Sequence, residues 1–357
     1  MTTPSPFIEI QGRKIGTGRP AYIVAEISAN HNQSYETAVK MVHAAKEAGA
    51  DAVKLQTYTP DTMTIDCDNA HFQIGAGNNW AGQTLYQLYS KAYTPWDWQP
   101  RLKRLADQLG LHCFSSPFDV TAVDFLEEIG VPAYKIASFE LVDIPLIQYI
   151  ARKGRPIILS TGLAERSEIE EAVRAIRATG NSQIALLKCT SAYPAPPEEM
   201  NLKTIPQMIE DFGVPCGLSD HTLGHAVAVA GVALGASIVE KHFTLSRGME
   251  SPDAGFSLEP HEFRDLVDGI RTVEKAMGQV RYHPTAKELN NRVFRRSLFV
   301  VQDVKAGDRI SSENVRSIRP GNGLPPRRYP EVVNRRFTRD VRRGTPLAAD
   351  LVEMKTV

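Results

Sequence analysis

Short apolar runs alternate with stretches of helical character from Tyr22 to Met277. Apolar runs of this kind are typical of the buried parallel strands of α/β proteins. The predicted strands occupy residues 22–28, 51–56, 111–119, 132–140, 155–162, 183–194, 214–218 and 236–239. The predicted helices occupy residues 35–48, 95–109, 120–129, 144–152, 167–178, 202–212, 223–234 and 261–277. Eight strand–helix units within roughly 280 residues predict an α/β fold of the TIM (β/α)8 barrel type rather than an open sheet.

The strand–helix alternation stops after Gly278. Residues 281–295 are predicted to form a linker with a short helix, and turns at KAGD and PGNG then separate short strands. A further strand–turn–strand is predicted over residues 338–353. The predicted domains are therefore a barrel over residues 1–280, a linker over 281–295 and a small β-rich domain over 296–357. Inside the barrel, the long connection over residues 57–95 is expected to carry a function or short helices of its own.

Composition changes this picture mainly through the distribution of charge. The 357 residues carry 41 Lys or Arg and 41 Asp or Glu, so the formal net charge is zero. Residues 281–357 hold 17 basic and 8 acidic side chains, a charge of +9, which leaves −9 on the first 280 residues. We expect the basic tail to dock on the acidic body of its own oligomer or to face an anionic substrate. The non-catalytic alternative is a nucleic-acid-binding or ice-binding tail, but its sequence shows no aromatic stacking platform or groove-binding helix, so we expect no nucleic-acid partner.

The cysteines and the apolar runs indicate where the protein works. Cys113, Cys189 and Cys216 fall in predicted strands and no CxxC is present, so we expect buried free thiols in a reducing, cytoplasmic compartment. The longest apolar run, residues 226–239, has about 14 residues, too few to cross a membrane. We therefore expect no membrane partner.

Two histidines, His221 and His242, follow two successive predicted strands. In a parallel barrel the C-terminal strand ends share one mouth, so the two imidazoles are expected to lie together. Such a pair can hold one divalent metal ion and leave positions open for water and substrate. The structural alternative is that each histidine is an ordinary hydrogen-bonded side chain.

Hydroxyl and ammonium groups gather at the same predicted mouth. The residues concerned are Lys54, Lys135, Ser116, Ser138, Ser160, Ser191 and Ser219. Directional donors combined with positive charge suit a phosphate or a carboxylate, although any single serine at a strand end is often only a helix N-cap. Glu26 and Glu140 are candidates for proton transfer, or for salt bridges to Lys54 or Lys135.

Several stretches, in order along the chain, resemble the sialic acid (nonulosonate) synthase family. They are AEISANHN, AGADAVKLQTYTPDTMT, CFSSPFD, YKIASFE, STG, KCTSAYP, GLSDHT and EKHFT. The tail stretches RRSLFVVQDVKAGDRIS and SIRPGNG resemble the antifreeze-like (SAF) domain of the same family. The resemblance covers nearly the whole chain and implies a TIM barrel followed by a SAF domain.

The resemblance implies a metal-dependent condensation of phosphoenolpyruvate with the aldehyde of an open-chain amino sugar. C3 of phosphoenolpyruvate attacks the aldehyde, water adds at C2, and phosphate leaves by C–O cleavage. By motif match, His221 and His242 hold the metal, commonly Mn²⁺, with Mg²⁺ or Co²⁺ as alternatives. The phosphoenolpyruvate pocket then comprises Lys54, Lys135, Ser116, Ser138, Ser160, Ser191 and Ser219, and the sugar side comprises Glu26, Gln56, Tyr193 and Asp253. Arg319 matches an arginine that reaches the sugar of the partner subunit in a domain-swapped homodimer.

Within the family, KLQTYTPDT and KCTSAYP are most similar to the branch that makes pseudaminic acid from a 2,4-diacetamido-2,4,6-trideoxy sugar. Residues 189–191 read CTS where members that form N-acetylneuraminate typically have CTN, which argues against N-acetylmannosamine as the sugar. Synthesis of legionaminic or N-acetylneuraminic acid stays open as the alternative. A different class, a Schiff-base aldolase, would use Lys135 or Lys188, since a lysine desolvated in a barrel mouth can act as a nucleophile.

Overall fold

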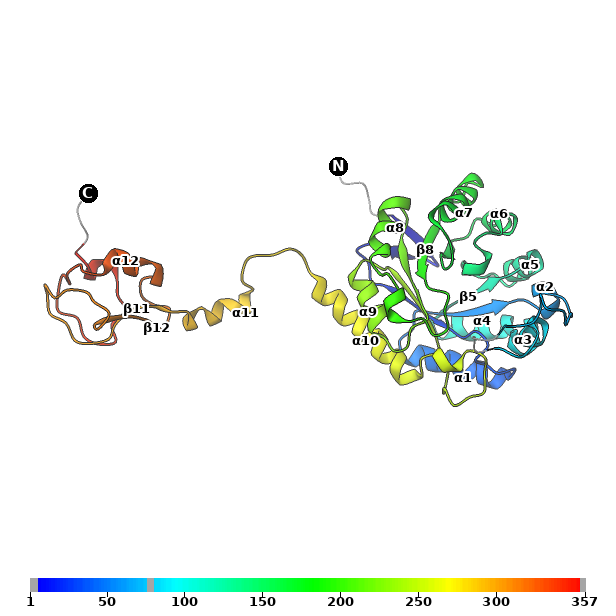
Figure 1. Cartoon of the computed structure of the whole chain (residues 1–357), viewed down its shortest axis with the longest axis horizontal. Helices are drawn as coiled ribbons and strands as arrows, with labels where there is room; N and C mark the ends of the chain where they lie inside the picture. Colours follow the sequence, from blue (N-terminus) through cyan, green and yellow to red (C-terminus); the bar gives the residue numbers. More distant parts are fainter. Residues whose placement is uncertain (1–5, 76–79, 354–357) are drawn as a thin grey trace. The chain divides into compact units, whose positions relative to one another are not determined.

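The computed structural model describes residues 6–75 and 80–353 of the chain. It divides into two compact units, Met1–Gly278 and Gln279–Val357, each with a hydrophobic core of its own. Figure 1 shows both units, with labels on many of their elements. Among the described residues, no helix combines the length and the apolar character needed to cross a membrane.

The first unit is a closed barrel of eight parallel strands. They are β3 (Tyr22–Glu26), β4 (Ala52–Thr57), β5 (His112–Pro117), β6 (Tyr134–Ile136), β7 (Ile157–Ser160), β8 (Ile184–Cys189), β9 (Cys216–Asp220) and β10 (Ile238–His242). Neighbouring strands follow chain order, and β10 closes the barrel by pairing with β3. Every strand lies within a predicted strand or overlaps one, so the predicted TIM barrel is confirmed.

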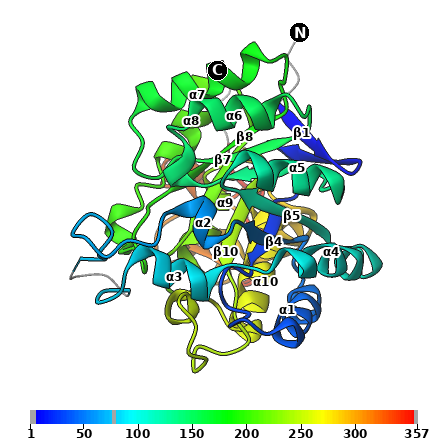
Figure 2. The same cartoon turned by 90° about the vertical axis from the view of Figure 1, so that its right-hand side faces the viewer.

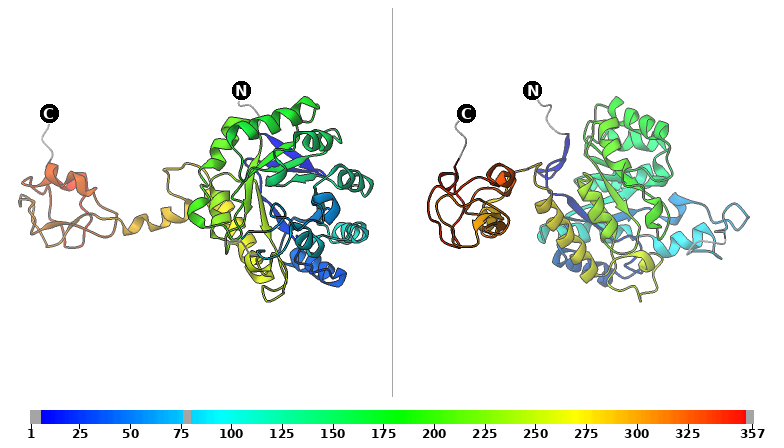
Figure 3. Two further views of the ribbon diagram at one scale, coloured as in Figure 1. Left: turned by 45° about the vertical axis from the view of Figure 1, so that its right-hand side comes forward. Right: turned by 60° about the vertical axis from the view of Figure 1, so that its left-hand side comes forward.

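Helices surround the barrel strands, as Figures 2 and 3 show from three further directions. They are α1 (Tyr35–Glu47), α4 (Gln99–Gln108), α5 (Val120–Glu128), α6 (Ile144–Ala151), α7 (Arg166–Ala178), α8 (Thr204–Phe212), α9 (Ala226–Ala233) and α10 (Pro260–Met277). The β4–α4 connection carries α2 (Pro60–Met63), α3 (Leu85–Ala92) and the 3-10 turn η1 (Trp96–Trp98), in line with the short helices predicted there. Further 3-10 turns are η2 (Ser138–Glu140), η3 (Pro197–Glu199) and η4 (Ala254–Phe256).

A β-hairpin that the sequence analysis did not predict precedes the barrel. It pairs β1 (Phe7–Ile10) with β2 (Arg13–Gly16) across a two-residue turn whose residues, Gln11 and Gly12, both have positive φ. Its isoleucines Ile8, Ile10 and Ile15 are buried in the barrel core. The backbone N–H of Glu9 donates to the Gln183 side chain at 2.9 Å, immediately before β8, so the hairpin covers the N-terminal end of the barrel.

The second unit is small and built mainly from isolated pairings. Its elements are α11 (Ala286–Leu289), η5 (Asn290–Phe294), β11 (Ser297–Val300), β12 (Val315–Ile318), η6 (Pro326–Arg328), α12 (Tyr329–Val332) and η7 (Ala349–Leu351). Strands β11 and β12 form an antiparallel pair. The strand–turn–strand predicted over residues 338–353 was wrong: this segment forms only single bridges, Val304↔Val341, Phe299↔Pro346 and Phe337↔Val352. A turn at Gly344, where φ is 89°, leaves extended segments too short for a ladder.

Candidate active site

Strand register places the polar strand-end residues of the barrel at one level. Glu26 pairs with Lys54 and with His242, and Glu240 pairs with Ser219. Because side chains alternate between faces along a strand, Ile238, Glu240 and His242 share one face of β10 while Lys241 lies on the other. All these polar side chains are buried, so each needs a partner inside the protein.

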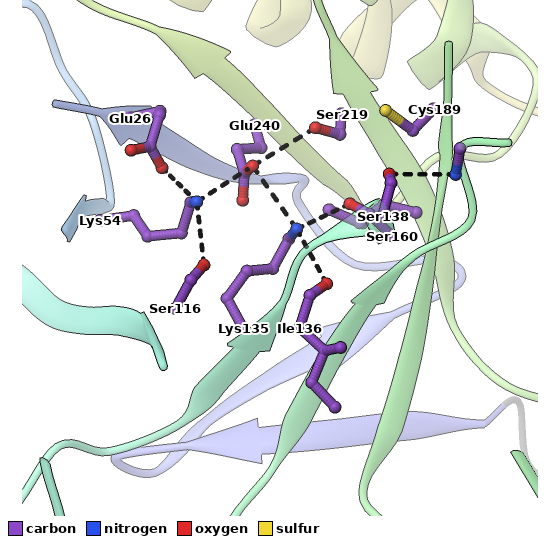
Figure 4. A network of polar contacts seen from close by, with 12 residues as sticks. Glu26, Lys54, Ser116, Lys135, Ile136, Ser138, Ser160, Cys189, Ser219 and Glu240 are labelled. Carbon is purple, nitrogen blue, oxygen red and sulfur yellow. Dashed lines mark hydrogen bonds and ion pairs between the residues drawn. The ribbon is translucent and has the colours of Figure 1, made fainter. Parts of the chain in front are cut away.

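Two buried lysines form the centre of this network (Figure 4). The Lys135 ammonium donates to Ser160 Oγ at 2.7 Å and to the Ile136 carbonyl at 3.3 Å. The Lys54 ammonium donates to Ser116 Oγ at 3.3 Å and forms an ion pair with Glu26. The result is a dense group of donors inside the barrel mouth.

Glu240 links the two lysines. Its Oε1 lies 3.5 Å from Lys54 Nζ and 3.7 Å from Lys135 Nζ, and Ser219 Oγ donates to the same oxygen at 3.3 Å. Burial alone would raise the pKa of Glu240, but the two ammonium groups hold that pKa below its ordinary value. For Lys54, burial alone would lower the pKa, yet Glu240 and Glu26 together raise it. We conclude that Lys54 and Glu240 are charged at neutral pH. For Lys135, burial lowers the pKa below its ordinary value even though Glu240 raises it, so Lys135 depends on this carboxylate for its charge.

Two further serines lie against the glycine that follows β7. Ser138 Oγ accepts a hydrogen bond from the Gly162 backbone at 3.1 Å. A Cβ at Gly162 would lie 2.7 Å from Ser138 Oγ and 2.2 Å from Ser191 Oγ, closer than van der Waals contact permits. Glycine is therefore needed here to let the backbone approach both hydroxyls.

The structure places the two predicted histidines next to each other. The ring centroids of His221 and His242 lie 5.4 Å apart, and the Tyr193 ring lies 4.4 Å from that of His221. Nδ1 of His221 donates to the Thr190 carbonyl at 3.0 Å, so Nε2 carries the lone pair in the neutral ring. Burial alone would lower the pKa of His221, but Cys189 and the Thr190 carbonyl raise it above its ordinary value. Nδ1 of His242 contacts Ser28 Oγ at 3.2 Å, and burial lowers the pKa of His242 well below its ordinary value.

This chemistry fits a divalent metal ion with two protein ligands. A neutral imidazole is the form that binds metal, and a hydrogen bond at Nδ1 is the usual way to orient the ring. Residues 6–75 and 80–353 contain no group of three or more His, Cys, Asp or Glu side chains arranged to hold an ion. His221 and His242 would therefore leave most coordination positions to water and substrate.

A cavity of about 420 Å³ opens beside His242. Its polar lining comprises Gln56, Glu140, His242 and Asp253, and the rest of its wall is mainly aromatic or aliphatic, including Tyr58, Met63, Leu88, Tyr89, Phe118 and Tyr193. Burial raises the pKa of Glu140 to about 7, and its Oε2 has no hydrogen-bond partner among the described residues. The cavity thus offers a few polar groups on an apolar surface, which suits an uncharged organic ligand of modest polarity.

A separate charge pair lies on the opposite face of β9 and β10 from Ser219, Glu240 and His242. Lys241 Nζ lies 2.8 Å from Asp220 Oδ2, and both side chains are fully buried. Lys241 also donates to the Thr222 carbonyl, while Asp220 Oδ1 accepts from the Thr222 backbone at 2.9 Å. These bonds hold the backbone on both sides of His221.

The structure brings nearly all predicted site residues to this mouth. They are Glu26, Lys54, Gln56, Ser116, Lys135, Ser138, Glu140, Ser160, Ser191, Tyr193, Ser219, His221, His242 and Asp253. Their catalytic roles stay predictions. Arg319 belongs to the second unit, where its side chain is exposed, so its role stays a prediction too.

Sequence reasoning missed one member of the site, Glu240, which bridges the two lysines. The signal was present, because Glu240 and His242 are two residues apart on one strand and must share a face. The apolar wall from the β4–α4 connection was missed as well. It depends on tertiary contacts such as the hydrogen bond from Trp96 Nε1 to the Tyr58 carbonyl at 3.0 Å.

Two family models match the chain. Residues 41–282 match the NeuB family, and residues 295–353 match the SAF domain. The first match covers most of the barrel unit, and the second lies within the small unit.

Known proteins are similar over nearly the whole chain. A pseudaminic acid synthase from Helicobacter pylori is 44% identical over 336 residues, which cover 94% of this chain and 98% of that protein. An N,N'-diacetyllegionaminic acid synthase from Legionella pneumophila is 36% identical over 344 residues, covering 95% of this chain and 96% of that protein. Among solved structures, an N-acetylneuraminic acid synthetase from Leptospira borgpetersenii in complex with citrate matches with a TM-score of 0.72 and 32% identity, covering 80% of this chain and 95% of that one.

Proposed function

The chain belongs to the NeuB family, and on that premise we propose that it is a pseudaminic acid synthase. It condenses phosphoenolpyruvate with 2,4-diacetamido-2,4,6-trideoxy-L-altrose and releases pseudaminic acid and phosphate. The observation that carries this assignment is the 44% identity, over 94% of the chain, to a protein of that activity, against 36% to a legionaminic acid synthase.

Phosphoenolpyruvate binds to the lysine and serine network inside the barrel mouth. Lys54 and Lys135 supply positive charge, and the surrounding hydroxyls supply directional donors to phosphate and carboxylate oxygens. C3 of the bound enol then attacks the aldehyde carbon of the sugar, water adds at C2, and the C2–O bond to phosphate breaks. Because the site is buried, these charged hydrogen bonds act in a medium of low dielectric constant, where they are strong.

Proton transfer falls to the carboxyl groups at the mouth. Glu140, with a pKa of about 7, is available near neutral pH both as donor and as acceptor. It lines the same cavity as His242 and Asp253, so it lies on the sugar side of the site. We assign it the proton that the aldehyde oxygen gains as it becomes a hydroxyl. Glu26, whose pKa burial also raises to about 7, is the second candidate for proton transfer.

His221 and His242 are proposed to hold a divalent metal ion, Mn²⁺ first and Mg²⁺ or Co²⁺ as alternatives. A bound ion of this kind supplies Lewis acidity, which polarises the aldehyde of the sugar. The hydrogen bonds at both Nδ1 atoms orient the rings for this task.

The apolar wall of the cavity supports the choice of sugar. Met63, Leu88 and Phe118 offer surface to the C6 methyl group and the two acetamido methyl groups of a trideoxy sugar. A sugar with a 6-hydroxyl would bury that hydroxyl against the same wall, which is unfavourable without a hydrogen-bond partner. We further propose that the enzyme is a domain-swapped homodimer in which Arg319 of the partner subunit contacts the sugar.

The test is phosphate release from phosphoenolpyruvate with a panel of 2,4-diacetamido and 2-acetamido hexoses. We expect the 2,4-diacetamido-2,4,6-trideoxy-L-altrose isomer to give the highest kcat/KM. A preference for the legionaminic acid precursor or for N-acetylmannosamine would reassign the chain within the family. Schiff-base chemistry would instead appear as covalent trapping by borohydride in the presence of pyruvate.

A further inference from the structure

Glu240 occupies the point on which the donors of the proposed phosphate pocket converge. Ammonium groups from β4 and β6 and a hydroxyl from β9 all reach a single carboxylate oxygen, Glu240 Oε1. These contacts are long, at 3.3–3.7 Å, while Lys135 makes its shortest bond, 2.7 Å, to Ser160 instead. Figure 4 shows the carboxylate between the two lysines.

The other oxygen of Glu240 is not committed. Oε2 is buried and has no hydrogen-bond partner among the described residues, although native proteins usually satisfy such atoms. The Glu240 side chain is only 6% exposed. In the described parts of the chain, the polar groups that Glu240 contacts are thus the groups that a phosphate would need. No other hydrogen bond holds the carboxylate in place when a phosphate takes over these contacts.

A phosphate group that contacts Lys54 and Lys135 must share them with this carboxylate. At an effective dielectric constant of about 20, two unit charges roughly 5 Å apart repel strongly enough to change a binding constant by about a few hundredfold. The carboxylate therefore either moves away from the lysines or opposes the anion from close by. In both cases it weakens the binding of phosphate.

We propose that Glu240 is a built-in counter-ion that competes with the phosphate group of the substrate and product for Lys54 and Lys135. This inference rests on the proposed function, because it takes the lysine network as the phosphate pocket. Between turnovers the carboxylate balances the charge of the two buried ammonium groups. It contacts them again as product phosphate leaves. It is a positioning residue that sets affinity and release, and it forms no bond to the reacting atoms.

The test is titration of the protein with inorganic phosphate and with phosphoenolpyruvate by calorimetry. Glu240→Gln keeps the shape of the side chain and removes its charge, so both anions should bind at least about tenfold more tightly than to the wild type. Glu240→Asp keeps the charge in the pocket and should show no such gain. If Glu240→Gln folds only when phosphate is present, the phosphate concentration that restores the folded state reports the same affinity.

A matched control comes from the other face of the same strands. Asp220→Asn also removes one buried carboxylate that is paired with a lysine, here Lys241. It should lower the thermal midpoint but leave phosphate affinity within about twofold of the wild type. Weaker or unchanged anion binding by Glu240→Gln would overturn the proposal and make Glu240 a support that holds the lysines for the ligand. If Lys54→Met binds phosphate as tightly as the wild type, the pocket itself is misassigned, and this separates failure of the function from failure of the inference.

Discussion

A single methyl group at Gly162 should disable part of the phosphoenolpyruvate pocket while leaving the fold in place. Gly162 has no positive φ, so alanine is compatible with its backbone. The added Cβ would lie 2.2 Å from Ser191 Oγ and 2.7 Å from Ser138 Oγ. Both hydroxyls must then move by roughly 0.5–1 Å or more to reach ordinary contact distances.

The structure indicates how large the effects should be. A hydrogen bond to a charged ligand is worth about 1.5–3 kcal/mol, so the loss of one or both hydroxyls should raise KM for phosphoenolpyruvate by about tenfold to more than a hundredfold. Within the protein, Gly162→Ala should break the hydrogen bond from the Gly162 backbone N–H to Ser138 Oγ, which is worth about 1 kcal/mol. That predicts a fall in the thermal midpoint of only about 2–4 °C.

The assay is initial-rate phosphate release at varied phosphoenolpyruvate and saturating sugar, with thermal denaturation of the same samples. Gly255→Ala is the control, because a Cβ at Gly255 meets no atom within 4 Å and its φ is also not positive. We expect this control to behave as wild type. An unchanged KM for phosphoenolpyruvate in Gly162→Ala would show that Ser138 and Ser191 do not bind this substrate.

Three further predictions concern the metal, the proton donor and the dimer. His221→Ala and His242→Ala should abolish turnover and weaken Mn²⁺ binding in equilibrium dialysis. The thermal midpoints of both variants should stay near that of the wild type. Full activity of the wild type after exhaustive chelation would exclude a metal. Because burial raises the pKa of Glu140 to about 7, its protonated form is lost above that pH, and kcat should fall as the pH rises through about 7. Glu140→Gln should lower kcat by about 10²–10⁴-fold and abolish this fall of kcat with rising pH. A wild-type kcat that stays constant between roughly pH 6 and 8 would contradict the role of Glu140 as proton donor. Mixing His221→Ala with Arg319→Ala protomers should restore part of the activity, because one site of a mixed dimer combines both intact residues; no recovery despite demonstrated subunit exchange would mean that Arg319 serves its own chain.

The barrel was predictable because buried parallel strands leave continuous apolar runs. The β1–β2 hairpin was not predicted, since its strands have only four residues each and alternate weakly. The signal that could have found it is the two-residue turn Gln11–Gly12, with Ile8, Ile10 and Ile15 at positions that the hairpin buries. Short strands are specified by their turn as much as by their own residues.

The strand-end rule predicted where Lys54, Lys135 and the two histidines lie, because parallel strands bring their C-terminal ends to one mouth. It did not predict that Glu240 would bridge the lysines. That contact joins residues far apart in the sequence and depends on side-chain reach across the barrel interior. The exact course of the β4–α4 connection was likewise unpredictable, since it is fixed by packing of its side chains rather than by a repeating pattern.

The Asp220–Lys241 pair sets a limit on recombination between members of this family. Each partner lies on a different strand, and neither is exposed to solvent. A chimera whose crossover falls between residues 220 and 241, joining this chain to a relative with uncharged residues there, would leave one buried charge alone, at a cost of about 3–5 kcal/mol. Exchange of sugar specificity between relatives should therefore keep β9 and β10 from the same parent and place the junctions before or after both strands.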